Sequence, residues 1–169
     1  MNCPACGAEI MPKPDTEGYR CDYCHQVFYP GEEDDGVEVL GDQPDPATSR
    51  ACPVCNQPLV QATVAKTPLL FCTQCHGLLM RMGELLDLID ALRTAVDKPA
   101  VQTAPERGDL KRTVQCPQCR RRMDTHFYAG PGNVIVDSCG DCFLIWLDRG
   151  ELTRIAHAPD EVGPEDHDW

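Results

Sequence analysis

The chain has 169 residues, a formal net charge of −12 and twelve cysteines. Aromatic residues make up only 6% of the sequence, which leaves little material for one large core. We therefore expect several very small domains that disulfides or metal thiolates hold together. The acidic balance repels nucleic acid on average, which disfavours it as a partner.

The start of the sequence, from Met1 to Cys6, has no basic segment followed by an apolar one, so no secretory signal is visible. No apolar run approaches the ~20 residues that a membrane-spanning helix needs. We therefore expect a cytoplasmic protein with no membrane partner. In that reducing compartment, paired cysteines bind metal more often than they form disulfides.

The cysteines form six Cys-x-x-Cys pairs, and a proline follows the first cysteine of every other pair, at Pro4, Pro53 and Pro117. This alternation groups the pairs into three modules, and four thiolates satisfy the tetrahedral shell of one zinc ion. We predict three zinc ions as cofactors, one per module. The predicted ligands are Cys3, Cys6, Cys21 and Cys24; Cys52, Cys55, Cys72 and Cys75; and Cys116, Cys119, Cys139 and Cys142.

Two residues between paired cysteines allow a tight turn that aims both sulfurs at one ion. Gly7 and Asn56, which follow their pairs, tolerate the left-handed backbone that such a turn often needs. Between the pairs, residues 59–64 and 134–136 are rich in β-branched side chains and are predicted strands. The expected fold is a small, metal-stabilised α+β protein with three tandem zinc ribbons of the β-hairpin type.

An apolar triplet begins three residues after the last cysteine of each module. The triplets are Val27-Phe28-Tyr29, Leu78-Leu79-Met80 and Ile145-Trp146-Leu147. In the second and third modules the agreement extends to Gly83-Glu84-Leu85 and Gly150-Glu151-Leu152, which indicates a tandem repeat.

The second and third ribbons are each expected to precede an α-helix. Leu85, Leu88, Ile89, Leu92 and Val96 recur at helical spacing, which predicts an amphipathic helix over 83–97. A shorter helix follows Asp148, which with Glu151 resembles a capping box, and Pro159 ends it. These helices either cover their own ribbon or bind a partner.

We expect the following organisation along the chain. It comprises zinc ribbon 1 (1–30), an acidic, proline-rich linker (31–50), zinc ribbon 2 with its helix (51–97), a linker (98–110), zinc ribbon 3 with its short helix (111–158) and an acidic tail (159–169). The linkers are rich in Pro, Gly and charge, so we expect mobile tethers between independently folding ribbons.

The segment from Cys139 to Leu152, which includes Trp146-Leu147-Asp148-Arg149-Gly150-Glu151, resembles the transcription factor IIB-like zinc-ribbon family of small prokaryotic proteins. The likeness covers Cys116 to about Ile155. It is degenerate from Cys52 to about Leu92, and only the generic ribbon remains from Cys3 to Tyr29. The resemblance implies zinc on the cysteines named above.

Other uses of the cysteines stay open. Iron in a rubredoxin-like site has the same four ligands as zinc. Cys21 to His25 and Cys72 to His76 match the Cys-x-x-Cys-His signature of covalent haem, but Phe143 replaces the histidine in the third module. Thioredoxin-like redox chemistry lacks a surrounding βαβ pattern.

The function that we expect is that of a zinc-binding, non-enzymatic interaction protein, either an adaptor or a regulatory accessory factor. All metal positions are filled by protein, and no catalytic constellation is visible, so we name no catalytic residue and no cofactor besides zinc. The alternative is nucleic-acid binding by the third module. It rests on Phe127, Tyr128 and a basic cluster that comprises Arg107, Lys111, Arg112, Arg120, Arg121 and Arg122.

Overall fold

The computed structural model describes residues 19–20, 22–23, 27–28, 35–41, 50–94, 111–129 and 134–157. Within the first predicted ribbon, β1 (Tyr19–Arg20) and β2 (Val27–Phe28) pair antiparallel. The ligands predicted there, Cys3, Cys6, Cys21 and Cys24, lie outside the described residues, as do the tail, most of the first linker and all of the second.

The second ribbon is an antiparallel meander of β4 (Val60–Val64), β5 (Thr67–Phe71) and β6 (Leu78–Arg81). Ala65 and Lys66 both have positive φ, at 46° and 70°, which is the backbone of a tight two-residue hairpin turn. Helix α1 (Met82–Thr94) follows β6 directly. The Asp87 and Asp90 side chains lie on its exposed face, whereas Leu85, Leu88 and Ile89 are buried.

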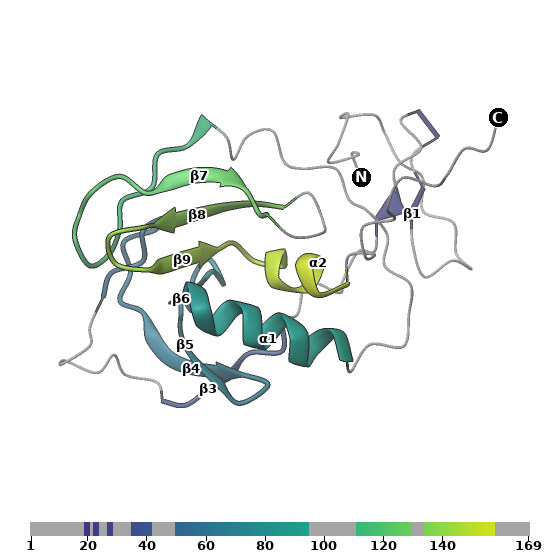
Figure 1. Ribbon diagram of the computed structural model, residues 1–169, viewed down its shortest axis with the longest axis horizontal. Helices are drawn as coiled ribbons and strands as arrows, with labels where there is room; N and C mark the ends of the chain where they lie inside the picture. Colours follow the sequence, from purple (N-terminus) through teal and green to yellow (C-terminus); the bar gives the residue numbers. More distant parts are fainter. Residues whose placement is uncertain are drawn as a thin grey trace.

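The third ribbon repeats this order with β7 (Asp124–Phe127), β8 (Ile135–Cys139), β9 (Leu144–Leu147) and helix α2 (Glu151–His157). All its strands are antiparallel to their neighbours. Figure 1 shows the strands of both ribbons side by side, with the two helices next to each other.

The second and third ribbons form one seven-stranded sheet in the order β3-β4-β5-β6-β9-β8-β7. The expectation of independently folding ribbons is therefore wrong for these two. The two ribbons join because β6 and β9 each have a free edge within their own ribbon. Each strand pairs with the backbone hydrogen-bonding groups on the free edge of the other.

The joint between β6 and β9 has a local two-fold character. Leu79 lies opposite Trp146, and these are the middle residues of the two apolar triplets. Leu78 pairs with Leu147 and Met80 with Ile145, so the pairing maps onto itself when the ribbons are exchanged. The repeat in the sequence thus becomes a pseudo-symmetric pair in the structure.

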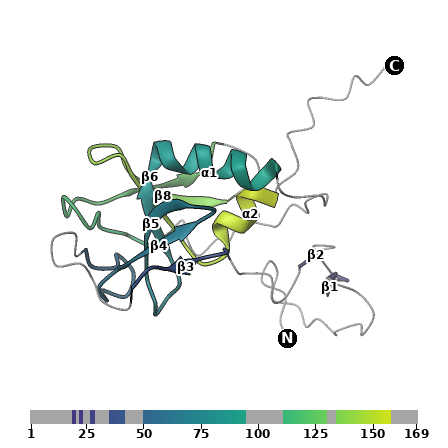
Figure 2. The same ribbon diagram turned by 90° about the horizontal axis from the view of Figure 1, so that it is seen from below.

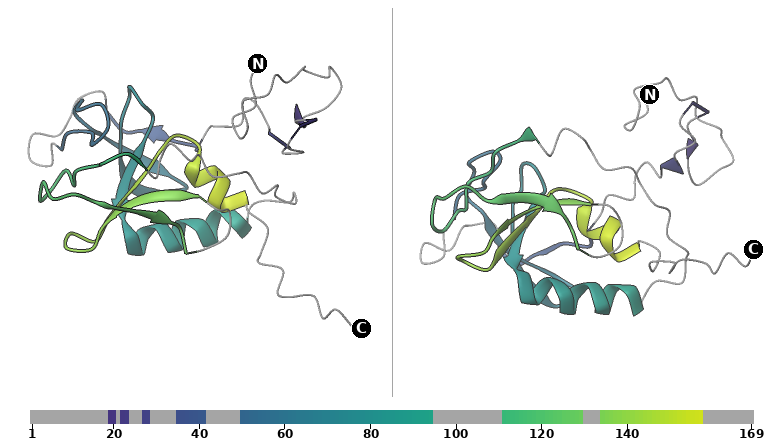
Figure 3. Two further views of the ribbon diagram at one scale, coloured as in Figure 1. Left: turned by 90° about the horizontal axis from the view of Figure 1, so that it is seen from above. Right: turned by 45° about the horizontal axis from the view of Figure 1, so that its top comes forward.

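Side chains on the two faces of this sheet build two cores because successive strand residues point to opposite faces. On one face Leu78, Met80, Ile145 and Leu147 join residues of α1 and α2 in a helix-side core. On the other face Leu79, Leu144 and Trp146 join cysteines of both ribbons in a cysteine-side core. Figures 2 and 3 show α1 running along one side of the sheet.

The segment 35–41 belongs to the same unit, although it falls in the predicted first linker. Strand β3 (Glu38–Val39) pairs with β4 and extends the sheet, and Leu40 N donates to Gln61 O at 2.9 Å. The expectation of a mobile tether is therefore wrong for this segment. Among the described helices, none combines the length and apolar character needed to cross a membrane.

Candidate metal centres

Two groups of four cysteines converge in the described part of the chain, and in each group all four sulfurs lie within 4.8 Å of one another. Each group takes two sulfurs from a Cys-Pro-x-Cys turn and two from the later pair, as predicted. The groups are Cys52, Cys55, Cys72 and Cys75 in the second ribbon, and Cys116, Cys119, Cys139 and Cys142 in the third.

The spacing of the sulfurs fits a tetrahedral metal ion. Zn–S bonds of ~2.3 Å place the sulfurs of a four-thiolate shell about 3.8 Å apart. The Sγ atoms of Cys52 and Cys75 are 3.5 Å apart, those of Cys55 and Cys72 are 3.3 Å apart, and those of Cys119 and Cys139 are 3.7 Å apart. A disulfide would bring two sulfurs to ~2.05 Å, and all eight cysteines are free thiols.

The residue after each pair adopts the left-handed backbone. Its φ is 60° at Asn56, 63° at His76, 64° at Arg120 and 54° at Phe143. Three of these amides close the turn on the first cysteine; Asn56 N, for example, donates to Cys52 O at 2.9 Å. The expectation for Asn56 is thereby confirmed, and one turn geometry recurs at all four described pairs.

Backbone amides also approach the sulfurs. Val54 N and Cys55 N donate to Cys52 Sγ at 3.4 and 3.5 Å, so they are placed to disperse the charge of a bound thiolate. In the absence of metal, burial raises the pKa of Cys52 to about 11. Metal binding must therefore displace a proton at neutral pH, which makes affinity fall as the pH falls.

The structure also explains His76, which completed a haem-like signature. Both cysteines of that motif contribute their sulfurs to the four-sulfur cluster. The imidazole packs edge-on against Phe71 with the ring centroids 5.6 Å apart. His76 also has the left-handed backbone that Asn56 adopts after the first cysteine pair of the same ribbon. The equivalent stretch from Cys21 to His25 is not among the described residues as a whole.

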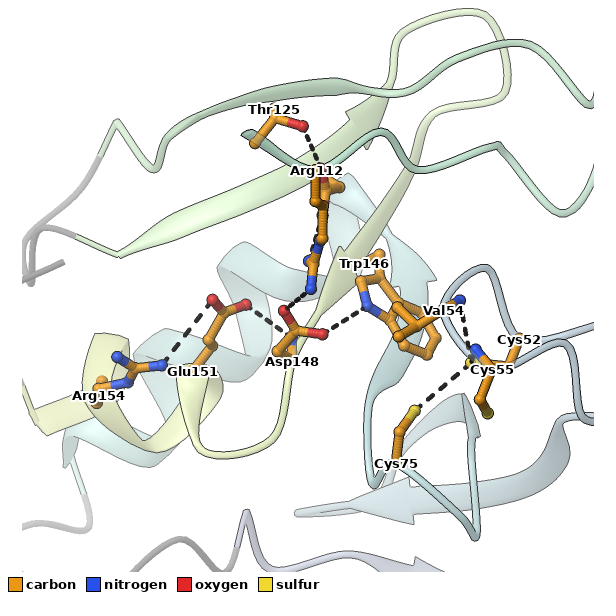
Figure 4. A network of polar contacts seen from close by, with 11 residues as sticks. Cys52, Val54, Cys55, Cys75, Arg112, Thr125, Trp146, Asp148, Glu151 and Arg154 are labelled. Carbon is orange, nitrogen blue, oxygen red and sulfur yellow. Dashed lines mark hydrogen bonds and ion pairs between the residues drawn. The ribbon is translucent and has the colours of Figure 1, made fainter. Parts of the chain in front are cut away.

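A polar network links the third ribbon to the shared core (Figure 4). Arg112 binds the buried Asp137 at 2.5 Å and also forms an ion pair with Asp148. Asp137 accepts a second bond from Thr125 at 2.5 Å, and Asp148 accepts one from Trp146 Nε1 at 3.0 Å. Burial disfavours the charge of Arg112, but its carboxylate partners outweigh burial and raise its pKa above the ordinary value.

Only half of the predicted capping box at α2 forms. Glu151 accepts the amide of Asp148 at 2.7 Å, but the Asp148 side chain is used by Trp146 and Arg112. Asp35 supplies the missing cap: its carboxylate accepts Gly150 N at 2.9 Å and Thr153 N at 3.0 Å. Sequence reasoning missed this role because Asp35 lies in an acidic run more than a hundred residues away.

Fewer residues of the predicted basic cluster are available to bind nucleic acid than the sequence suggests. Arg112 is committed to Asp137 and Asp148, and the exposed Arg121 pairs with Asp141 at 2.8 Å. Tyr128 is partly buried against the helix-side core, whereas Phe127 is about half exposed. Lys111, Arg120 and Arg122 are exposed, and Arg107 is outside the described residues.

Comparison with known families agrees with this geometry. Residues 115–158 match the family model described as a transcription factor zinc-finger, and residues 1–82 match the one described as a double zinc ribbon. Both matches are to zinc-ribbon families, and the one over residues 115–158 coincides with the ribbon that contains the second four-cysteine group. No curated protein and no solved structure matches the chain.

Proposed function

We propose that the chain is a zinc-binding, non-enzymatic interaction protein, an adaptor or a regulatory accessory factor. The observation that carries the proposal is the closure of both described clusters by four cysteine sulfurs each. A catalytic zinc keeps a position for water or substrate, whereas a four-cysteine shell is typical of structural zinc. Zinc then acts by holding a recognition surface in shape.

Several apolar side chains on this scaffold are exposed and suit contact with a protein. Phe143 is 68% exposed at the tip of a cysteine turn, and Leu40 is 61% exposed next to the edge strand β3. Phe143 also occupies a left-handed position, where a bulky side chain is unfavourable. The cysteine turn sets this backbone at all four described pairs, so the turn does not require an aromatic ring here, and the exposure of the ring supports a binding role.

The proposal includes a third zinc ion on Cys3, Cys6, Cys21 and Cys24. The double zinc ribbon match supports it, since that match spans residues 1–82 and so includes both the first and second modules. We also propose a cytoplasmic location, because free thiols in metal-type clusters suit a reducing compartment.

A proximity cross-linking experiment with full-length protein tests the adaptor role. Zinc-loaded wild type and the Phe143→Ser variant serve as baits in extract from the native cell, with Leu86→Ser as a control exposed leucine on α1. We expect one protein to be cross-linked by wild type and Leu86→Ser and to be lost with Phe143→Ser. Identical recovery by all three baits would remove the Phe143 surface from the proposal.

Nucleic-acid binding remains the second candidate because the matched family is described as a transcription factor zinc-finger. The exposed Arg120, Arg121 and Arg122 would have to neutralise phosphates, so affinity would fall steeply with salt. The net charge of −12 and the ion pair between Arg121 and Asp141 oppose this function. We therefore expect weak binding.

The test uses the full-length chain, because a fragment containing only the third ribbon would leave β9 without its partner β6. Fluorescence anisotropy with single- and double-stranded probes compares wild type with a variant in which the three arginines are changed to Ser. The control is Arg81→Ser, an exposed arginine on the second ribbon. Submicromolar binding that only the triple variant loses would replace the adaptor function with the nucleic-acid one.

A further inference from the structure

We infer that the second and third ribbons load zinc cooperatively, so that an ion in one cluster raises the affinity of the other. The inference rests on the proposed zinc binding and adds a coupling between the two sites. It follows from the way in which the two clusters share secondary structure, core and polar contacts.

The first link is the sheet. Strand β6 begins soon after the Cys72–Cys75 turn, and β9 begins soon after the Cys139–Cys142 turn. Each strand is the hydrogen-bonding partner of the other. A ribbon that loses its metal loses the constraint on its own turn and therefore weakens the edge on which its neighbour depends.

The second link is the cysteine-side core, which contains Cys52 and Cys72 from one cluster and Cys116 and Cys139 from the other. Trp146 is fully buried in this core and also packs on Gly77, the second residue after the Cys72–Cys75 pair. The indole therefore connects the turn of one metal site with the strand that follows the other.

The third link consists of backbone and side-chain contacts at the rim of the joint. Met82 N, at the start of α1, donates to Phe143 O at 3.0 Å, beside the third ribbon's turn. Arg50, two residues before the Cys52–Cys55 turn, donates to Gln118 of the Cys116–Cys119 turn at 2.8 Å. Arg93 of α1 donates to Ile155 O of α2 at 3.4 Å.

These links make the pair one folding unit with two metal sites. Metal binding to a ribbon is coupled to folding, because the empty site is not preformed in an unfolded chain. When both sites require the same folded unit, the first ion bears most of the cost of ordering it, and the second binds to a site already assembled. That difference is a positive coupling between the sites.

The distribution of zinc among molecules tests the inference. Full-length protein carrying Cys21→Ser and Cys24→Ser, which silence the first predicted site, is titrated with zinc and analysed by native mass spectrometry. Two independent sites, whatever their affinities, leave at least about half of the molecules with a single ion when half of the sites are filled; a tenfold coupling between equal sites lowers that share to roughly a quarter. We expect a share of about a quarter or less.

A variant then assigns the coupling to the shared core. Trp146→Ala changes no cysteine and should return the singly loaded share to half or more, whereas the half-exposed control Phe127→Ala should leave it low. The distribution of zinc in the protein that retains Trp146 tests the cooperativity even if Trp146→Ala does not fold. A share of half or more in that protein overturns a tenfold coupling between sites of similar affinity and leaves zinc binding intact, whereas failure to bind zinc at all overturns both.

Discussion

The indole of Trp146 lies directly against the backbone of Gly77, where a Cβ atom would come within 2.1 Å of Trp146 Cζ2. Trp146 is fully buried and its Nε1 is held by Asp148, so the ring has little freedom to retreat. A side chain at position 77 is thus excluded by a residue of the other ribbon. This contact explains why glycine stands at the joint between the two ribbons.

Replacing Gly77 by Ala should lower the free energy of unfolding by about 1–3 kcal/mol, the usual cost of overpacking a core. Urea denaturation of the zinc-loaded protein measures this change. The matched control is Gly83→Ala in α1, where a Cβ meets nothing within 4 Å and helix propensity favours Ala. The prediction fails if both variants have the stability of the wild type.

Arg112 should matter far more to stability than Arg121, although both form ion pairs with aspartate. Asp137 is fully buried, so Arg112→Met leaves a buried carboxylate with only Thr125 as a hydrogen-bond partner. We expect a loss of about 3–5 kcal/mol in the free energy of unfolding. The double variant with Asp137→Asn should recover part of this loss because it removes the buried charge.

Arg121→Met is the control for that series. Its side chain and that of Asp141 are 72% and 59% exposed, and exposed pairs contribute at most about 1 kcal/mol. If Arg112→Met and Arg121→Met lower the free energy of unfolding equally, burial does not determine how much each ion pair contributes to stability.

The grouping of the eight described cysteines into two clusters was predictable from sequence, and the joint between ribbons was not. Cys-x-x-Cys spacing alone specifies a turn that brings two sulfurs together, and the alternating proline assigned the pairs to modules. The triplets containing Leu79 and Trp146 predicted strands but carried no information on which edge each would pair with. Pairing between distant strands depends on tertiary packing, which periodicity does not report.

The same limit applies to the two helices and the linker. The apolar spacing of Leu85, Leu88 and Ile89 indicated a buried face but did not reveal that it would cover a core built by two ribbons. Asp35 is one of several consecutive acidic residues, and nothing in its neighbourhood distinguishes it from a solvated charge. Its partners, Gly150 and Thr153, could be known only from the fold.

Asp35→Ala should destabilise the protein by about 1–2 kcal/mol, because it leaves two amides at the start of α2 without their acceptor. Asp35→Asn should cost less, since one oxygen remains. Hydrogen exchange at the Gly150 and Thr153 amides measures the effect locally, and both should exchange faster in Asp35→Ala. Glu38→Gln, an exposed change three residues further on, should leave both amides as protected as in the wild type.

Elemental analysis of freshly purified, reduced protein should give three zinc ions per chain. Two of them would occupy the clusters whose sulfurs lie within 4.8 Å of one another, and the third would require Cys3, Cys6, Cys21 and Cys24.

Changing Cys21 and Cys24 to Ser should therefore lower the zinc content to two ions per chain and leave the Trp146 environment unchanged, because the indole belongs to the other two ribbons. Changing Cys72 and Cys75 to Ser should instead alter Trp146 fluorescence, since it removes metal from the ribbon that packs on the indole. Iron in place of zinc, or two zinc ions in the wild type, would contradict the predicted metal content, and the two double variants would then show which cluster is at fault.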